Sequence, residues 1–247
     1  MGAIQVMWLR QIKRYWRSRA RMIGMLGQPI LFLLALGFGL GPIFQAAGQG
    51  DFIQFLSPGI IAMTVLFSAM FSGIEVIWDK QFGFLKETLV APVSRGQIML
   101  GRALGGATVA MVQGIVVLLI TLLIGFRPSL SLIPLALLFM FAIAFLFTSL
   151  GIAIASKLED MQAFPLIMNF LIMPIFFLSG ALFPLDNIPN VLEIITRFNP
   201  LTYGVDGLRG AFGGVAHLGF AIDGGVIIVI GAIVFAVGSY FFSKIEI

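Results

Sequence analysis

Six long apolar segments follow one another along this chain and are separated by shorter polar stretches. A membrane-spanning helix needs about 20 consecutive, mainly apolar residues, and each segment is long enough. The pattern therefore predicts an all-α membrane protein that crosses the bilayer six times. The predicted spans are residues 22–44, 55–78, 98–125, 130–155, 163–183 and 220–242.

Residues 1–21 have a different, amphipathic pattern. Apolar residues recur at helical spacing at Ile4, Trp8, Ile12 and Tyr15, with most basic residues elsewhere around the helix. This predicts an interfacial helix, and the alternative is a polar lead-in that merely orients the first span. The basic residues assigned to this helix are Arg10, Lys13, Arg14 and Arg17. The following apolar run is too long for a signal peptide.

Basic residues are distributed unevenly between the two sides of the predicted membrane. Lysine and arginine concentrate in the cytoplasmic segments of membrane proteins. Twelve of the fifteen lie in the amino-terminal segment, in the loops after spans two and four, or in the carboxyl tail. Only Arg127, Arg197 and Arg209 lie on the opposite side. We therefore expect both termini to be cytoplasmic.

The loop between spans two and three carries a group of charges from Asp79 to Arg102. Its centre has the pattern of a short amphipathic helix that ends at Ala91-Pro92. Only 11% of the chain is charged, so this concentration of charge in one loop suggests a partner outside the membrane.

A second unusual segment runs from Pro184 to about Gly219, on the predicted external side. It is too polar to span the bilayer and too apolar for an ordinary loop. The pattern predicts two short re-entrant helices, one starting near Asn187-Ile188-Pro189 and one from Leu201 to Phe212, with a plain surface loop as the alternative.

Composition and missing motifs narrow the function. The chain is 60% hydrophobic and only 11% charged, whereas soluble domains carry about 25% charged residues. It has no cysteine, a single histidine (His217) and no GxxxxGK[ST] phosphate loop. We expect no catalytic, cofactor or metal site on this chain, and no nucleic-acid partner.

Three ionisable residues near the ends of spans two and three are candidate functional residues, because burying charge in a membrane is costly. Glu75 and Asp79 lie one helical turn apart, and Arg102 begins span three. They form either a hinge or a local ion pair, in which Glu75 would pair with Arg95, Arg102 or Lys80. No ionisable residue lies clearly at mid-membrane, which disfavours a proton- or sodium-driven carrier.

Small residues four positions apart let helices approach closely. Two such pairs occur, Gly37 with Gly41 and Gly101 with Gly105.

Taken together, the chain resembles the permease subunits of ABC-2-type ABC transporters, which include drug and lipo-oligosaccharide exporters. The resemblance covers residues 1–247 as a single transmembrane domain. After the basic amino-terminal helix, it rests on three segments: PGIIAMTVLF (58–67), FGFLKETLVAPVSRGQIMLGR (82–102) and FFLSGALFPLDNIPNVLEIITRFNPLTYGVDGLRG (176–210).

The resemblance implies a permease that works as a homodimer with two copies of a separate ATPase, in a prokaryotic cytoplasmic membrane. ATP and Mg would bind the ATPase and not this chain. The loop between spans two and three is similar to the family's coupling helix, and the amino-terminal helix, including Trp8, to its interfacial helix. The implied coupling residues are Phe82, Phe84, Leu85, Lys86, Glu87, Leu89, Val90 and Arg95. Spans one and five resemble those that line the dimer.

The implied function is outward transport of a hydrophobic or amphipathic substrate, such as a drug, a lipid or a lipid-linked saccharide. The alternative is a passive channel or a membrane assembly factor without ATP coupling. The apolar spans suit such a substrate, yet the same residues would also face lipid or neighbouring helices in any membrane protein.

Overall fold

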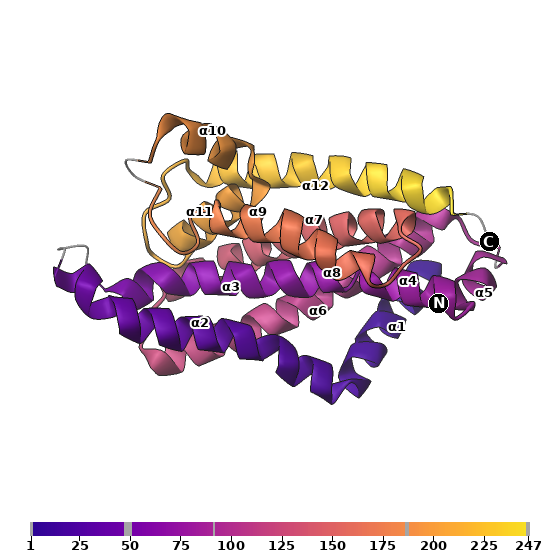
Figure 1. The fold of residues 1–247 in the computed structure, drawn as a ribbon, viewed down its shortest axis with the longest axis horizontal. Coiled ribbons are helices and arrows are strands. Elements are labelled where there is room, and N and C mark those ends of the chain that lie inside the picture. Colours follow the sequence, from indigo (N-terminus) through magenta and orange to yellow (C-terminus); the bar gives the residue numbers. More distant parts are fainter. Residues whose placement is uncertain (1, 47–50, 91, 186–187, 246–247) are drawn as a thin grey trace.

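The computed structural model describes residues 2–46, 51–90, 92–185 and 188–245, without the side chains of Leu89 and Val90. Within these ranges every regular element is a helix (Figure 1). The helices are α1 (Ala3–Arg17), α2 (Arg19–Ala46), α3 (Phe52–Phe71), α4 (Ile74–Gln81), α5 (Phe84–Val90), α6 (Arg95–Ile124), η1 (Leu130–Leu132), α7 (Ile133–Lys157), α8 (Ala163–Ile167), η2 (Met168–Ile172), α9 (Met173–Phe177), α10 (Asn190–Phe198), α11 (Pro200–Ala211) and α12 (Phe220–Ser243).

Five stretches of the described chain are long and apolar enough to cross a membrane, and they match five of the six predicted spans. They are Arg19–Ala46, Phe52–Gln81, Arg95–Ile124, Leu130–Lys157 and Phe220–Ser243. The second contains a break, since α3 ends at Phe71 and α4 resumes at Ile74.

The length predicted for the fifth span, residues 163–183, is wrong. The helical part ends at Phe177, and its middle, η2, is a π-helix. Pro174 lies in the middle of this segment and removes one backbone donor from the helical ladder, whereas Pro165 lies in the first turn of α8, where backbone amides have no helical partner. After Phe177 the chain turns at Gly180, whose φ of 77° is a left-handed conformation that glycine adopts most easily.

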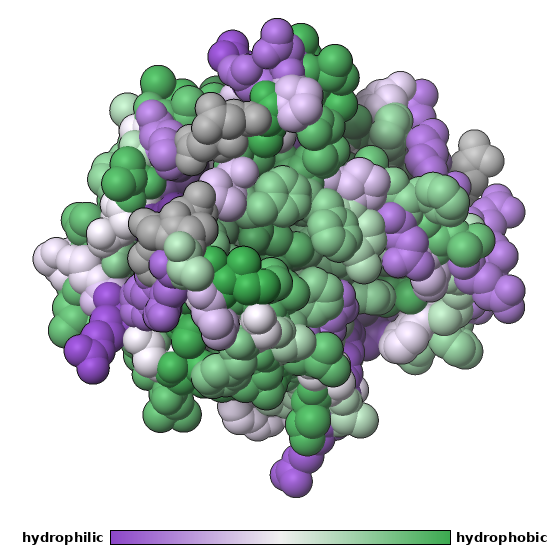
Figure 2. Space-filling model, turned by 60° about the vertical axis from the view of Figure 1, so that its left-hand side comes forward, coloured by the Kyte–Doolittle hydropathy of each residue, from purple (hydrophilic) through white to green (hydrophobic). Residues whose placement is uncertain are grey.

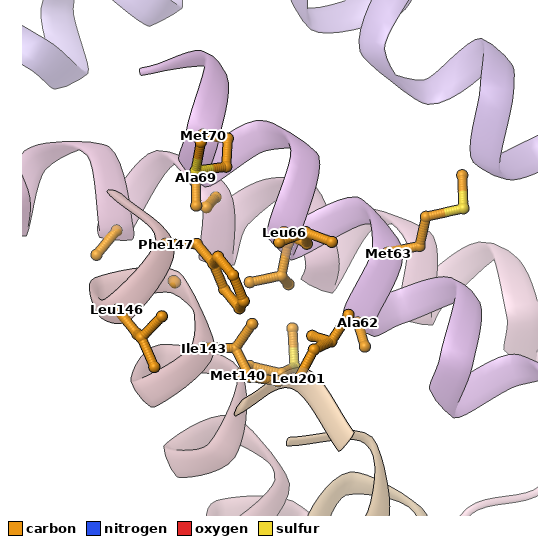
Figure 3. Packing of buried hydrophobic residues seen from close by; sticks show 14 of the residues in the cluster. Ala62, Met63, Leu66, Ala69, Met70, Met140, Ile143, Leu146, Phe147 and Leu201 are labelled. Atoms are coloured by element: carbon orange, nitrogen blue, oxygen red, sulfur yellow. The ribbon is translucent and has the colours of Figure 1, made fainter. Parts of the chain in front are cut away.

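The core forms around α3, which is buried along most of its length. Its Leu66 points toward Ile143 and Phe147 of α7, and Leu201 of α11 closes the cluster from one end (Figure 3). All four side chains are 1% exposed or less. Helix α11 is therefore part of the core, although it lies in a segment predicted to be only half-buried.

Helices α3 and α7 cross with almost no space between their backbones. A Cβ atom on Gly73 would lie 2.4 Å from the carbonyl carbon and oxygen of Gly151, and one on Gly151 would lie 2.7 Å from the oxygen of Met70. Real Cβ atoms do not approach other atoms this closely. Glycine is therefore required on both sides of the crossing.

The two predicted short helices between the fifth and sixth spans are present as α10 and α11. Asn199 separates them, and its side chain caps α11 by accepting a hydrogen bond from the Leu201 amide at 3.0 Å. The predicted start at Asn187 lies outside the described residues, and α10 begins at Asn190. Helix α10 is mostly exposed, unlike α11.

The polar helices lie at opposite ends of the molecule. The start of α1, all of α5 and the end of α12 lie together at one end, and α10 and α11 lie at the other (Figure 1). Figure 2 brings the α10–α11 end forward and shows hydrophobic residues across the middle of the view, with hydrophilic residues nearer its margins.

Candidate functional site

Behind the loop that carries the charged residues, four arginines surround two buried carboxylates. We call this group the charge cluster: Arg10, Arg14, Arg21, Glu75, Asp79 and Arg102. It joins four helices, because α1 supplies Arg10 and Arg14, α2 supplies Arg21, α4 supplies both carboxylates and α6 supplies Arg102.

Asp79 is the centre of the charge cluster. Its Oδ2 accepts a hydrogen bond from Nη2 of Arg102 at 2.5 Å. Its Oδ1 accepts hydrogen bonds from Arg10 at 2.9 Å and Arg14 at 3.2 Å. Arg102 is 1% exposed and Asp79 is 2% exposed, so this pair is withdrawn from solvent. Charge-assisted hydrogen bonds of this kind are among the strongest in proteins.

Glu75 does not have the partners predicted from the sequence. Its Oε1 accepts a hydrogen bond from Arg21 at 2.5 Å, and its Oε2 lies 4.0 Å from Arg14. Lys80 instead donates hydrogen bonds to the carbonyl oxygens of Ser156 and Leu158, at the end of α7. Arg95 donates to the carbonyl oxygens of Ser243 and Ile245, at the end of α12. Both cations therefore cap helix carboxyl termini.

Arg21 was missed as a site residue by sequence reasoning. It lies at the start of an apolar run, where an arginine normally extends toward the membrane surface. Nothing local indicated that it would pair with a carboxylate 54 positions away. The only available signal was the large number of basic residues at the amino terminus.

Helix α1 packs closely on α6. Cβ atoms on Gly101 and Gly105 would lie 2.7 Å from Met7 and 2.6 Å from Gln11, respectively, so this predicted glycine pair does permit close approach. Gly37 and Gly41 have no comparably close neighbour. The buried residues of α1 are Met7, Gln11 and Tyr15, a face only partly shared with the predicted apolar stripe.

Two polar contacts fix α1 in place. The indole of Trp8 donates a hydrogen bond to the hydroxyl of Thr108 at 3.0 Å, and the Gln113 amide donates to the hydroxyl of Tyr15. Burial raises the pKa of Tyr15. The amphipathic helix is therefore attached to the bundle as well as being suited to a membrane surface.

Between α1 and the α4–α5 turn lies a hollow of about 640 Å³, which we call the basic hollow. Its walls carry four cations and several apolar side chains, and the carboxylate of Asp79 lies at its inner side. Phe82 and Phe84 are 71% and 53% exposed at its rim. The lining residues are Val6, Leu9, Arg10, Lys13, Arg14, Arg17, Asp79, Phe82 and Phe84.

The basic hollow brings together residues from the two segments that the sequence singled out separately. The four basic residues assigned to α1 and the two phenylalanines assigned to the coupling segment all line it. The Arg10 guanidinium lies 6.0 Å from the Phe84 ring centroid, within the usual range for a cation–π contact.

The other predicted coupling residues have different surroundings. Lys86 and Glu87 are exposed on α5. Leu85 is 2% exposed and belongs to the core, so it anchors α5 and does not present a contact surface. Sequence alone could not show which residues of this seven-residue helix face the core, so Leu85 was not distinguished from the exposed residues beside it. The side chains of Leu89 and Val90 lie outside the described residues.

No group of three or more potential metal ligands occurs within the described residues. What this end of the molecule offers is a basic and aromatic recess whose lining residues form ion pairs with α4 and α6. Such a surface can hold a protein segment and transmit its displacement into the bundle.

Comparisons with known proteins give a consistent result. The family model for ABC-2 type transporters matches residues 2–212. Nodulation protein J of Rhizobium leguminosarum bv. trifolii is 30% identical over 198 residues, covering 78% of this chain and 75% of that protein.

Two relatives named putative transport permease ycf38 match as well. The putative transport permease ycf38 of Pyropia yezoensis is 31% identical over 217 residues, covering 83% of this chain and 72% of the relative. The permease of the same name from Cyanophora paradoxa is 31% identical over 186 residues, and the match spans 74% of this chain and 64% of that relative. The chain belongs to the ABC-2 type transporter family, as a multi-pass membrane permease.

Proposed function

We propose that this chain is the transmembrane subunit of an ATP-driven exporter that moves a hydrophobic or amphipathic substrate outward across the cytoplasmic membrane. Two copies would work with two copies of a separate ATPase, which binds ATP and Mg. Both termini and α5 would then face the cytoplasm. The observation that carries the proposal is the basic hollow, because it forms one recess from the two segments expected to meet an ATPase.

The charge cluster supplies a route from that recess into the membrane. An ATPase segment in the basic hollow would contact α1 and the α4–α5 turn. Asp79 lines the hollow and also binds Arg102 of α6, so a displacement of α4 must move α6 or break a buried ion pair. Since α4 follows directly from α3, the span that contains α3 and α4 and the span formed by α6 would both move with the ATPase.

The coupling proposal predicts that Phe84→Ala and Lys86→Glu weaken ATPase binding. The exposed Phe84 ring is the type of side chain that dominates protein interfaces, where truncation costs about 2 kcal/mol, or roughly thirtyfold in affinity. The measurement is copurification of the ABC ATPase with the tagged permease, together with substrate-stimulated ATP hydrolysis by the complex.

Phe198→Ala is the matched control, because Phe198 is 82% exposed on α10 at the opposite end of the molecule. It should leave copurification unchanged. Normal ATPase recovery and normal stimulation in both α5 variants would refute a coupling role for this surface.

The dimer proposal predicts disulfide cross-links through α2 and the fifth apolar segment. The chain contains no cysteine, so single substitutions report without background. Phe38→Cys and Phe170→Cys introduce thiols at side chains that are 61% and 83% exposed. Oxidation in membranes should yield a covalent dimer from one or both variants.

Ile228→Cys provides the control for this experiment. Ile228 is 64% exposed on α12, which is not one of the two segments proposed to line the dimer, so this variant should remain monomeric. Dimers from Ile228→Cys alone would place the interface at α12 and would contradict an interface formed by α2 and the fifth apolar segment.

A further inference from the structure

A second pocket lies between α2 and the broken helix α3–α4, distinct from the basic hollow. Its volume is about 410 Å³, within the range of about 300–1,000 Å³ typical of small-molecule sites. Arg21 and Trp78 line it together with residues of α2 and α3. We call it the interhelix pocket.

The wall of this pocket contains a hydroxyl group without a partner. Ser57 and Thr64, also on α3, donate hydrogen bonds to the carbonyl oxygens four residues earlier at 2.7 and 2.8 Å. Ser68 does not: it is 3% exposed, and its Oγ has no partner among the described residues. A buried polar group without a hydrogen bond is costly, so Ser68 is suited to a ligand that enters the pocket.

Trp78 repeats this pattern on α4. Its indole Nε1 is buried and has no acceptor within the described part of the chain. An indole N–H can only donate. The pocket is thus lined by an unused donor from each of two helices, and both would be satisfied by an oxygen-rich group.

The remaining lining residues define the rest of the ligand. The cation of Arg21 lines one part of the pocket, and it attracts an anion. Met25, Met63, Phe67 and Phe71 provide apolar walls, which suit an acyl chain. Methionine and phenylalanine walls adapt easily to flexible apolar groups.

We propose that the interhelix pocket binds a single acidic amphiphile of the phospholipid type. Its phosphate would accept hydrogen bonds from Ser68, Trp78 and Arg21, and its acyl chain would lie against the apolar wall. The site does not depend on ATP coupling, because all of its residues belong to this chain.

The position of Arg21 connects this site to the charge cluster. Arg21 donates its 2.5 Å hydrogen bond to Glu75, so a bound phosphate would share or withdraw that guanidinium. An occupied pocket would thereby weaken the contact between α2 and α4.

The test uses the full-length permease in detergent with Trp8→Phe and Trp16→Phe, so that Trp78 is the only tryptophan. Phosphatidylglycerol brominated near its ester carbonyls is titrated against Trp78 fluorescence, in parallel with phosphatidylcholine carrying the same brominated chains. We expect saturable quenching at about tenfold lower concentration for the acidic lipid, because the choline cation of phosphatidylcholine offsets its phosphate charge, whereas phosphatidylglycerol presents a net negative charge to Arg21.

Ser68→Ala should raise the half-quenching concentration of brominated phosphatidylglycerol several-fold. Ser149→Ala is the matched control: Ser149 is also buried, with an Oγ that has no partner in the described ranges, but it lies on α7 and does not line the pocket. This control should leave the titration unchanged.

Three results would overturn the proposal. Equal quenching by the two lipids would remove the preference for an acidic head. Equal half-quenching concentrations for Ser68→Ala and Ser149→Ala would show that the lipid does not bind at Ser68. Release of the lipid by glycerol phosphate at a similar concentration would indicate a small-anion site without a role for the acyl chain.

Discussion

Replacing Asp79 with leucine is expected to lower the free energy of unfolding by about 3–5 kcal/mol, the usual cost of removing one partner of a buried ion pair. Arg102 would keep its charge at 1% exposure without its carboxylate. Its Nε and Nη1 already lack partners among the described residues, and the hydrogen bond from its Nη2 to Asp79 would be lost. Unfolding by SDS titration of the detergent-solubilised protein, followed by circular dichroism, measures this loss.

A double variant separates charge from packing. Asp79→Leu combined with Arg102→Met removes both charges and should recover most of the lost stability, since apolar replacement of a whole buried pair is often neutral. Glu193→Gln is the surface control. It breaks the pair with Arg197 at 2.7 Å, whose side chains are 48% and 73% exposed, and should cost less than about 1 kcal/mol. A loss of that small size in Asp79→Leu would contradict a structural role for the buried pair.

Adding one methyl group at Gly73 should destabilise the protein by about 2–3 kcal/mol, the upper part of the usual range for overpacking. In Gly73→Ala the new Cβ would meet the backbone of Gly151 at 2.4 Å. Backbone atoms cannot rotate away as a side chain can, so α7 must move apart from the α3–α4 break that contains Gly73. The same SDS titration measures the effect.

Gly39→Ala is the matched control, because a Cβ at Gly39 of α2 would have no neighbour within 4 Å. Alanine should be neutral or stabilising there by about 0.5–1 kcal/mol, since it restricts the unfolded chain and favours the helix. If Gly73→Ala were as harmless as Gly39→Ala, the close crossing of α3 and α7 would be incorrect.

The sequence predicted five long spans well because each is an apolar run long enough to cross the bilayer, and the ends of α6 also carry local signals. Ser94 caps the start of α6 through its hydroxyl, and Gly125 ends that helix with a φ of 114°. The fifth apolar segment lacked such a signal. Leucine and phenylalanine continue past Phe177, so hydropathy did not change where the helix stops, and only Pro174 and Gly180 indicated a break.

The sequence predicted which segments contribute to the site, but it did not predict which of their charged residues pair. The charged loop and the basic amino terminus each stood out by composition, and Glu75, Asp79 and Arg102 were grouped as a possible hinge or ion pair. The pairing named for Arg102 was with Glu75, whereas Arg102 pairs with Asp79. The partners of Glu75 were not predicted, because Arg14 and Arg21 come from helices packed against α4 only in the folded protein. Sequence spacing favours near neighbours such as Lys80, and helix packing overrides it here.

The short helical segment from Ala163 to Phe177 has a consequence for the thickness of the membrane around it. Its 15 residues extend about 22 Å at the rise of an α-helix, whereas the hydrocarbon core of a bilayer measures about 30 Å. A short apolar segment is accommodated by local thinning of the lipid. Where the second permease copy does not cover α8 and α9, we therefore expect the bilayer to be thinnest beside them, which would shorten the distance that a polar head must travel through hydrocarbon.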